Sequence, residues 1–89
     1  MTDKQPTYEE AQTLLDALPE YQWLTRNPQA WWSTTEISKG LGIHISVVLN
    51  WLKTKQIPGA LEYPGRWNVP RSALLIFLAT RHLKSLPDA

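Results

Sequence analysis

Cysteine is absent from this 89-residue chain, so neither disulfides nor cysteine-bound metals stabilise it. No segment approaches the roughly twenty consecutive apolar residues that a membrane-spanning helix needs. The N-terminus lacks the charged and apolar regions of a secretory signal. We therefore expect a small, soluble, cytoplasmic protein with no membrane contact, held together by one modest apolar core.

Residue patterns typical of enzymes are also missing. The two histidines, His44 and His82, lie far apart, and no acidic cluster stands near them at metal-ligand spacing. Glu9 and Glu10 suit the first turn of a helix, beside the positive end of its dipole, better than a catalytic pair. Residues 40–42 have neither the glycine run nor the lysine of a phosphate-binding loop. The sequence predicts no enzyme, no metal and no cofactor.

The net charge is close to zero, but the charges are unevenly distributed. Residues 1–33 carry two cations against five acidic residues, a net charge of −3. Residues 34–86 carry seven cations against two acidic residues, a net charge of +5. A basic half of this kind is either an ordinary solvated surface or a binding face for double-stranded DNA, which is an anionic rod. The acidic half would repel the same ligand.

The most informative segment, residues 33–55, has the pattern of two short helices joined by a turn. Ser33 and Glu36 match the capping box, in which each side chain bonds the backbone amide of the other residue. Trp32 is placed to pack on Ile37 across that helix start. These signals predict that the first helix begins directly after Ser33.

Gly42 interrupts the apolar pattern where a chain reversal requires a positive backbone φ. After it, Val48, Trp51 and Leu52 repeat at the three-and-four spacing of one buried helix face. The opposite face of this second helix is then expected to carry Ile45, Ser46, Val47, Leu49, Asn50 and Lys53.

The segment 57–69 is too rich in proline and glycine for a helix. Residues 63–66 suit a type II turn with Pro64 second and Gly65 third, which predicts a two-stranded hairpin with Arg66 at its tip. Alternation predicts that each strand turns one face to the core, through Leu61, Tyr63, Trp67 and Val69. Pro70 is expected to open a last helix over residues 71–86, ended by Pro87. The fold class is mainly α with a small two-stranded hairpin.

Residues 27–29, Asn-Pro-Gln, are the only plausible linker, which divides the chain into an N-terminal helical extension, 1–30, and a body, 31–86. A helix from Thr7 to Leu18 begins with a second capping box, formed with Glu10, and ends at Pro19. The last helix carries two apolar stripes, one for the core and one for the extension. A homodimer interface is the alternative use of the second stripe, which comprises Leu75, Ala79, Leu83 and Leu86.

Five tryptophans in so short a chain predict mainly core volume. The functional alternative is a set of aromatic rings that stack on nucleic-acid bases, but such platforms usually lie among basic residues. These tryptophans mostly lie in apolar runs.

Several short motifs between Ser33 and Leu78, roughly half the chain, recur together in one group of DNA-binding domains. They are Glu36-Ile37-Ser38, Leu41-Gly42-Ile43, Val48, Leu52, Ile57-Pro58 and Gly65-Arg66-Trp67-Asn68-Val69-Pro70-Arg71. On these motifs the chain resembles the winged helix-turn-helix domains of the excisionase group, which are similar to the DNA-binding heads of MerR-type regulators. The resemblance implies a second helix in the major groove and a hairpin wing against the backbone or minor groove.

The chain departs from this family pattern at three positions. His44 stands where the family usually has a serine that caps the second helix, Ser38 replaces a small alanine, and Lys55 replaces a glycine. The outward face of the second helix is also more apolar than usual, through Ile45, Val47 and Leu49. That strip motivates an alternative function, a protein-interaction module or homo-oligomer that does not bind DNA.

The main hypothesis is sequence-specific binding of double-stranded DNA, by a transcriptional regulator or an excisionase-like architectural factor. Ser46 and Asn50 are expected to contact base edges, and Val47 a thymine methyl group. We expect phosphate contacts from the hydroxyl of Thr35, the imidazole of His44 and the ammonium groups of Lys39, Lys53 and Lys55. Arg66 is expected at the backbone or the minor groove.

Overall fold

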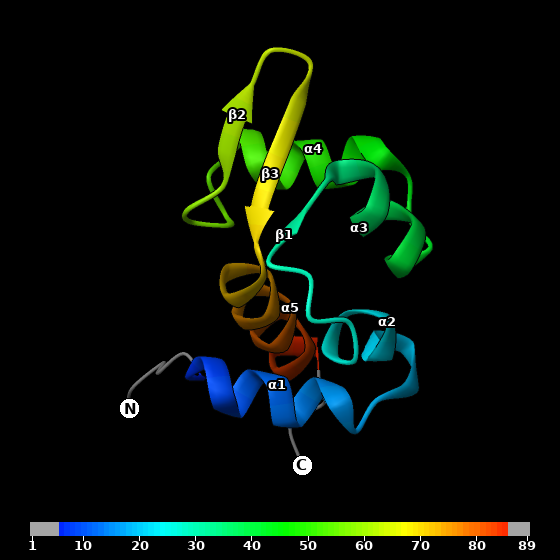
Figure 1. Ribbon diagram of the computed structural model, residues 1–89. Coiled ribbons are helices and arrows are strands. Elements are labelled where there is room, and N and C mark those ends of the chain that lie inside the picture. Colours follow the sequence, from blue (N-terminus) through cyan, green and yellow to red (C-terminus); the bar gives the residue numbers. More distant parts are fainter. Residues whose placement is uncertain (1–5, 86–89) are drawn as a thin grey trace.

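The computed structural model describes residues 6–85, which form a mainly helical chain with one small antiparallel sheet (Figure 1). The helices and the sheet pack together around a single apolar core. In chain order the elements are α1 (Tyr8–Asp16), a short 3-10 turn (Pro19–Tyr21), α2 (Gln22–Thr25), β1 (Trp31–Trp32), α3 (Thr34–Leu41), α4 (Ile45–Lys53), β2 (Leu61–Tyr63), β3 (Arg66–Pro70) and α5 (Arg71–Ser85).

Both predicted capping boxes are confirmed. At α3, the Ser33 hydroxyl accepts a hydrogen bond from the Glu36 amide at 3.2 Å, and the Glu36 carboxylate accepts one from the Ser33 amide at 2.9 Å. Thr7 and Glu10 make the same pair of bonds at the start of α1. The turn after α3 is also as predicted, since Gly42 has a φ of 70°. Local side-chain chemistry therefore sets where these helices begin and end.

The sheet has three strands, so the prediction of a two-stranded hairpin was one strand short. Strands β2 and β3 form the expected hairpin, with Tyr63 paired to Arg66 and Gly65 at a positive φ of 83°. On the other edge of β3, Trp31 pairs with Pro70 and Trp32 with Val69, which gives the order β1-β3-β2. A two-residue strand is too short to show an alternating pattern in a sequence.

The hairpin faces differ from the alternation prediction. Val69 is fully buried and Trp67 is half-buried, but Leu61 and Tyr63 are 44% and 42% exposed. The register explains the difference, because Leu61 lies directly across from Asn68 and Tyr63 across from Arg66. Opposed residues share one face of a sheet, so Leu61 and Tyr63 lie on the face opposite to Trp67 and Val69. The prediction that both strands contribute to the core was therefore wrong for β2.

Helix α5 forms the centre of the core, and α1 packs on it (Figure 1). Leu74, Leu75, Leu78 and Ala79 of α5 are almost fully buried, as are Ala11 and Leu15 of α1. The second apolar stripe of α5 is thus largely covered by the N-terminal helix, although Leu83 is 45% exposed. Leu86, the last residue predicted for this stripe and this helix, lies outside the described residues.

The tryptophans divide between the core and the surface. Trp32 and Trp51 are buried, whereas Trp31 is 46% exposed. Trp23 packs edge-on against Trp32, with ring centroids 5.3 Å apart, and lies directly on the backbone of α3 at Gly40. Only a residue without a side chain fits under that ring, which gives Gly40 a packing role that its sequence context did not indicate.

Within residues 6–85, no helix is both long enough and apolar enough to cross a lipid bilayer.

Candidate nucleic-acid interface

All nine side chains predicted to contact DNA belong to residues on the surface. Thr35 and Lys39 lie on α3, His44 precedes α4, and Arg66 begins β3 next to the hairpin turn. The remaining five lie on α4 or just after its end: Ser46, Val47, Asn50, Lys53 and Lys55. The set therefore spans two helices and the hairpin, with its largest part on one helix.

Helix α4 has one buried and one exposed face. Val48, Trp51 and Leu52 are at most 7% exposed, as their spacing predicted. Asn50 and Lys53 lie on the exposed side, one helical turn apart. Neither side chain makes a hydrogen bond to another residue in the range 6–85. Amide and ammonium groups that are exposed in this way are available to an external ligand.

His44 is the N-cap residue of α4. Its Nδ1 accepts a hydrogen bond from the Ser46 amide at 3.1 Å and lies 2.8 Å from the Ser46 hydroxyl. An imidazole nitrogen that accepts a hydrogen bond carries no proton, so the neutral ring keeps its proton on Nε2. The two predicted contact residues His44 and Ser46 are thus bonded to each other and act as one unit.

The apolar strip on α4 is narrower than the sequence indicated. Val47 is 40% exposed, but Ile45 and Leu49 are each half-buried. Because only one of the three side chains is largely open to solvent, the outward face of α4 remains mostly polar. An isolated exposed valine is ordinary on a protein surface.

Lys55 has an unusual backbone conformation. Its φ of 61° lies in the left-handed region, and it is the only residue other than glycine with a positive φ among residues 6–85. The chain closes α4 here, because the Lys55 amide donates to the Leu52 carbonyl at 3.1 Å and the Gln56 amide donates to the Trp51 carbonyl at 2.9 Å. A glycine fits this position at lower cost. The lysine therefore keeps a cation at the end of α4 against a backbone preference.

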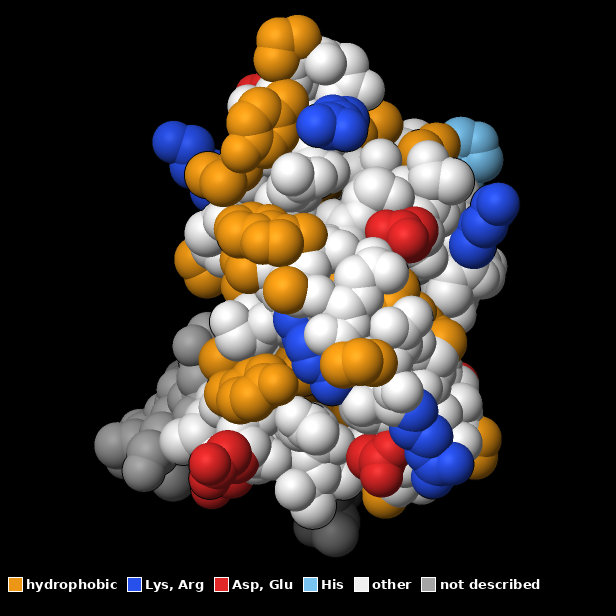
Figure 2. Space-filling model, viewed as in Figure 1, with side chains coloured by type: hydrophobic (Ala, Val, Ile, Leu, Met, Phe, Trp, Pro, Cys, Tyr) orange, Lys and Arg blue, Asp and Glu red, His pale blue; other side chains and the backbone are white. Residues whose placement is uncertain are grey.

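Arg66 stands beside the hairpin turn, and its guanidinium carbon lies 5.8 Å from the centre of the Tyr63 ring. This contact is a cation–π interaction at an exposed site. Figure 2 shows hydrophobic side chains running over the hairpin and down towards α1 on one face of the molecule, with Lys and Arg side chains scattered beside them.

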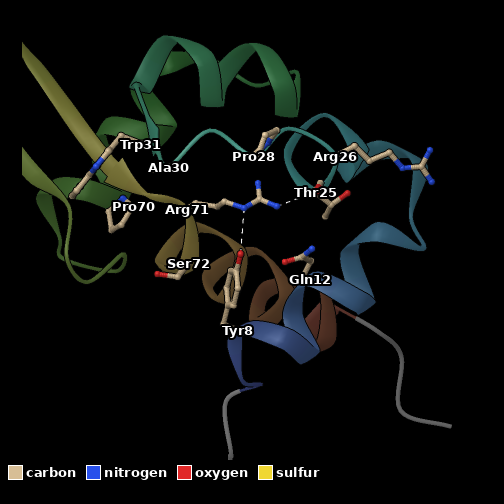
Figure 3. A pocket seen from close by; sticks show the side chains of 10 residues that line it. All are labelled: Tyr8, Gln12, Thr25, Arg26, Pro28, Ala30, Trp31, Pro70, Arg71 and Ser72. Carbon is tan, nitrogen blue, oxygen red and sulfur yellow. Dashed lines mark hydrogen bonds between the residues drawn. The ribbon is translucent and has the colours of Figure 1, made fainter.

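One cation of the basic half is not part of any surface patch. The Arg71 guanidinium points into a hollow between α1 and α2, where it donates to the carbonyls of Leu24, Thr25 and Asn27 and contacts the Tyr8 hydroxyl (Figure 3). Its donors are occupied by the protein itself. The count of seven cations thus overstates the charge offered to a ligand, and no local pattern in the sequence indicated this role of Arg71.

No protein-family model, curated protein or solved structure matches this chain. Among residues 6–85, no three His, Asp or Glu side chains gather at metal-binding distance. Any functional assignment therefore depends on the geometry of the residues described above.

Proposed function

We propose that this protein binds double-stranded DNA sequence-specifically, as a cytoplasmic winged helix-turn-helix protein. In this proposal α4 enters the major groove, α3 crosses above it, and the β2–β3 hairpin is the wing. The observation that supports it most is the division of α4 into a face anchored by Val48 and Trp51 and an exposed face with Asn50 and Lys53. A helix that inserts into a groove needs this division, because its base contacts come from one free side.

Each residue of the interface has a distinct role in this pose. Asn50 bonds an adenine edge through two atoms, and Val47 touches a thymine methyl group. His44 and Ser46 act together, because the cap holds the serine near the bases and the imidazole Nε2–H near a phosphate. Contacts to the DNA phosphates come from the hydroxyl of Thr35 and from the cations Lys39, Lys53, Lys55 and Arg66.

The first experiment is a titration of labelled duplex DNA at several salt concentrations. Four cations at the interface predict a log–log slope of affinity against salt of roughly −3 to −4, through counterion release. At low salt, random duplex should bind at about micromolar concentration. An affinity that does not change with salt, or no binding at low salt, contradicts the proposal.

The second experiment selects bound fragments from a random duplex pool. It returns a motif and a half-site spacing, and the spacing distinguishes a symmetric pair from single copies. A transcriptional regulator and an excisionase-like architectural factor differ in what they do to the duplex. Bending of the selected fragment, measured by gel mobility as the site is moved along it, favours the architectural role.

The alternative function is a protein-interaction module, and the exposure of Val47 at 40% is the observation that favours it. In this alternative, α4 binds another protein or a second copy of the chain through Ile45, Val47 and Leu49. Sedimentation of the free protein distinguishes the two functions. Self-association that Val47→Ser abolishes, together with absence of duplex binding, favours the alternative.

A further inference from the structure

A groove beside α5 combines apolar lining with positive charge. It is a hollow of about 360 Å³ between α5 and the segment that follows α4. Its apolar part comes from Pro58, Ala73, Ile76 and Phe77, and its cations are Arg81 and Lys84. No acidic side chain of residues 6–85 lines it. A hollow of this size accommodates a few side chains of a ligand.

The Arg81 guanidinium is held in place by aromatic rings. Its central carbon lies 5.0 Å from the centre of the Trp51 ring and 5.7 Å from that of Phe77. These two rings pack on each other, with centroids 4.9 Å apart. A cation–π contact needs no hydrogen bond from the guanidinium, so it leaves the N–H donors available to a carboxylate.

Neither cation of this groove is neutralised by the part of the chain that the structure describes. Arg81 and Lys84 make no side-chain hydrogen bond and no ion pair there, since the one salt bridge joins Arg26 to Asp16. The hollow in Figure 3 is different, because the donors of Arg71 are occupied by carbonyl groups. Free positive charge and half-buried apolar surface therefore coincide at the α5 groove.

We propose that the α5 groove binds an acidic amphipathic segment of a partner protein. An apolar side chain of that segment covers Ile76 and Phe77, one carboxylate forms a bidentate pair with Arg81, and a second carboxylate contacts Lys84. Charge complementarity selects an acidic partner, because both ionic groups of the groove are cations. The apolar lining favours a peptide over a duplex, since the sugar–phosphate surface of a duplex carries no projecting apolar side chain to fill it.

The groove meets α4 at its buried face, and none of its lining residues belongs to the proposed DNA contacts, although Gln56 of the groove directly follows Lys55. Arg81 reaches α4 at Trp51, which is on the buried face, whereas Asn50 and Lys53 are on the exposed face. The two surfaces therefore have no residue in common. The inference stands without the proposed function, and together the two describe a protein that joins DNA to an acidic partner.

The test uses the full chain labelled with nitrogen-15 and a short synthetic peptide in which Leu and Phe alternate with Asp and Glu. Amide signals of Ala73, Phe77 and Arg81 should shift on titration, and those of Asn50 and Lys53 should not. Arg81→Ala should weaken peptide binding by about tenfold or more, because a charged bidentate pair is lost. Lys84→Ala should weaken it by about two- to threefold.

Matched variants separate the groove from general charge effects. Arg66→Ala removes one cation at the hairpin and should leave peptide affinity unchanged. Arg81→Lys keeps the charge without the planar fork and should bind with intermediate affinity, which provides a test if Arg81→Ala does not fold. A peptide with the same acidic residues and serine in place of Leu and Phe should bind more weakly.

Three outcomes of the peptide titration overturn the inference. They are no binding of the acidic peptide, shifts centred on the exposed face of α4, and equal binding of a basic peptide. A duplex DNA probe that shifts Arg81 and Lys84 in place of the α4 signals also overturns it, because the groove is then a nucleic-acid contact. Failure of duplex binding with peptide binding intact contradicts only the proposed function.

Discussion

Asn50 and Lys53 are neighbours on the exposed face of α4, yet their proposed roles are different. Asn50 carries an amide that distinguishes one base from another, and Lys53 carries a charge that interacts with any phosphate. Two exposed side chains one turn apart experience nearly the same environment. Single substitutions at the two positions therefore separate base recognition from backbone attraction.

Asn50→Ala should relax the preference at one base position, at a cost of about 1 to 3 kcal/mol for the preferred base. Lys53→Ala should weaken all duplexes alike and flatten the salt slope by about one unit. Both are measured by titration of the selected site and of a variant site at several salt concentrations. If the two variants lose affinity in the same way, the proposed pose of α4 is wrong.

We expect Lys55 to lower the stability of the protein and to raise its affinity for duplex DNA. Lys55→Gly should stabilise the protein by about 0.5 to 1 kcal/mol, because glycine adopts the left-handed conformation without the steric cost. It should also weaken duplex binding, because the cation is lost. Urea denaturation and duplex titration measure the two effects.

Lys55→Ala is the matched control, since it removes the charge and keeps the strained φ of 61°. It should lose as much duplex affinity as Lys55→Gly without the gain in stability. Full duplex affinity in either variant would remove Lys55 from the interface.

At the scale of the elements, α3 is fixed by two contacts of different range. Its start is a local capping box, but its last turn is held by Trp23, which comes from α2 and lies on Gly40. A side chain at position 40 would overlap that ring. The position of α3 relative to α2 depends on this approach.

Gly40→Ala should destabilise the protein by about 1 to 3 kcal/mol, the usual cost of overpacking, despite the higher helix propensity of alanine. The midpoint of urea denaturation measures it. Adding Trp23→Leu should recover part of this loss, because the two changes share one contact. Gly42→Ala is the control, since it strains the backbone at a φ of 70° in open space and should show no such recovery.

The sheet agrees with the sequence prediction at its turn and differs from it in its third strand and in the exposure of β2. The turn at Pro64 and Gly65 was predicted correctly, and the hairpin follows from it. Strand β1 was not predicted, because its pairing joins Trp31 and Trp32 to residues almost forty positions later. The register of the hairpin pairs Leu61 with Asn68 and Tyr63 with Arg66, so both side chains lie on the face opposite to Val69 and are exposed, which alternation within each strand does not reveal.

Across the molecule, the N-terminal extension is tied to α5 by apolar packing and by the bonds of Arg71, and further polar contacts join its own two helices. Asp16 at the end of α1 accepts hydrogen bonds from the Thr25 hydroxyl at 2.8 Å and from Arg26 at 3.2 Å. These bonds, the one from Thr25 above all, lower the pKa of the Asp16 carboxyl below its usual value. The carboxylate thus contributes to stability in its charged form.

Asp16→Asn should therefore lower stability at neutral pH, by a margin that disappears in acid. A carboxyl whose pKa is lower in the folded state contributes its full stabilisation above the unfolded pKa and loses it as the pH falls through the folded pKa. Thermal denaturation of both proteins from neutral to strongly acidic pH measures the margin. Glu62→Gln is the control, because Glu62 is exposed and makes no side-chain bond within residues 6–85. A margin that persists in acid would contradict the assigned role.

The local structure of this protein follows from its sequence alone: two capping boxes, the glycine turn at Gly42, the hairpin turn and the buried stripe of α4. Each depends on residues within about four positions of one another, so the pattern that causes it is visible in the chain. It also predicted nine candidate contact residues, all of which belong to the surface.

Which charges are free and which faces are covered depends on the tertiary structure. Arg71 binds carbonyls more than forty residues earlier in the chain, while Arg81 stacks on Trp51 and keeps its donors open. Both read as ordinary basic residues in the sequence. The difference arises because a side chain's partners are set by how distant elements pack, and no local pattern encodes that packing.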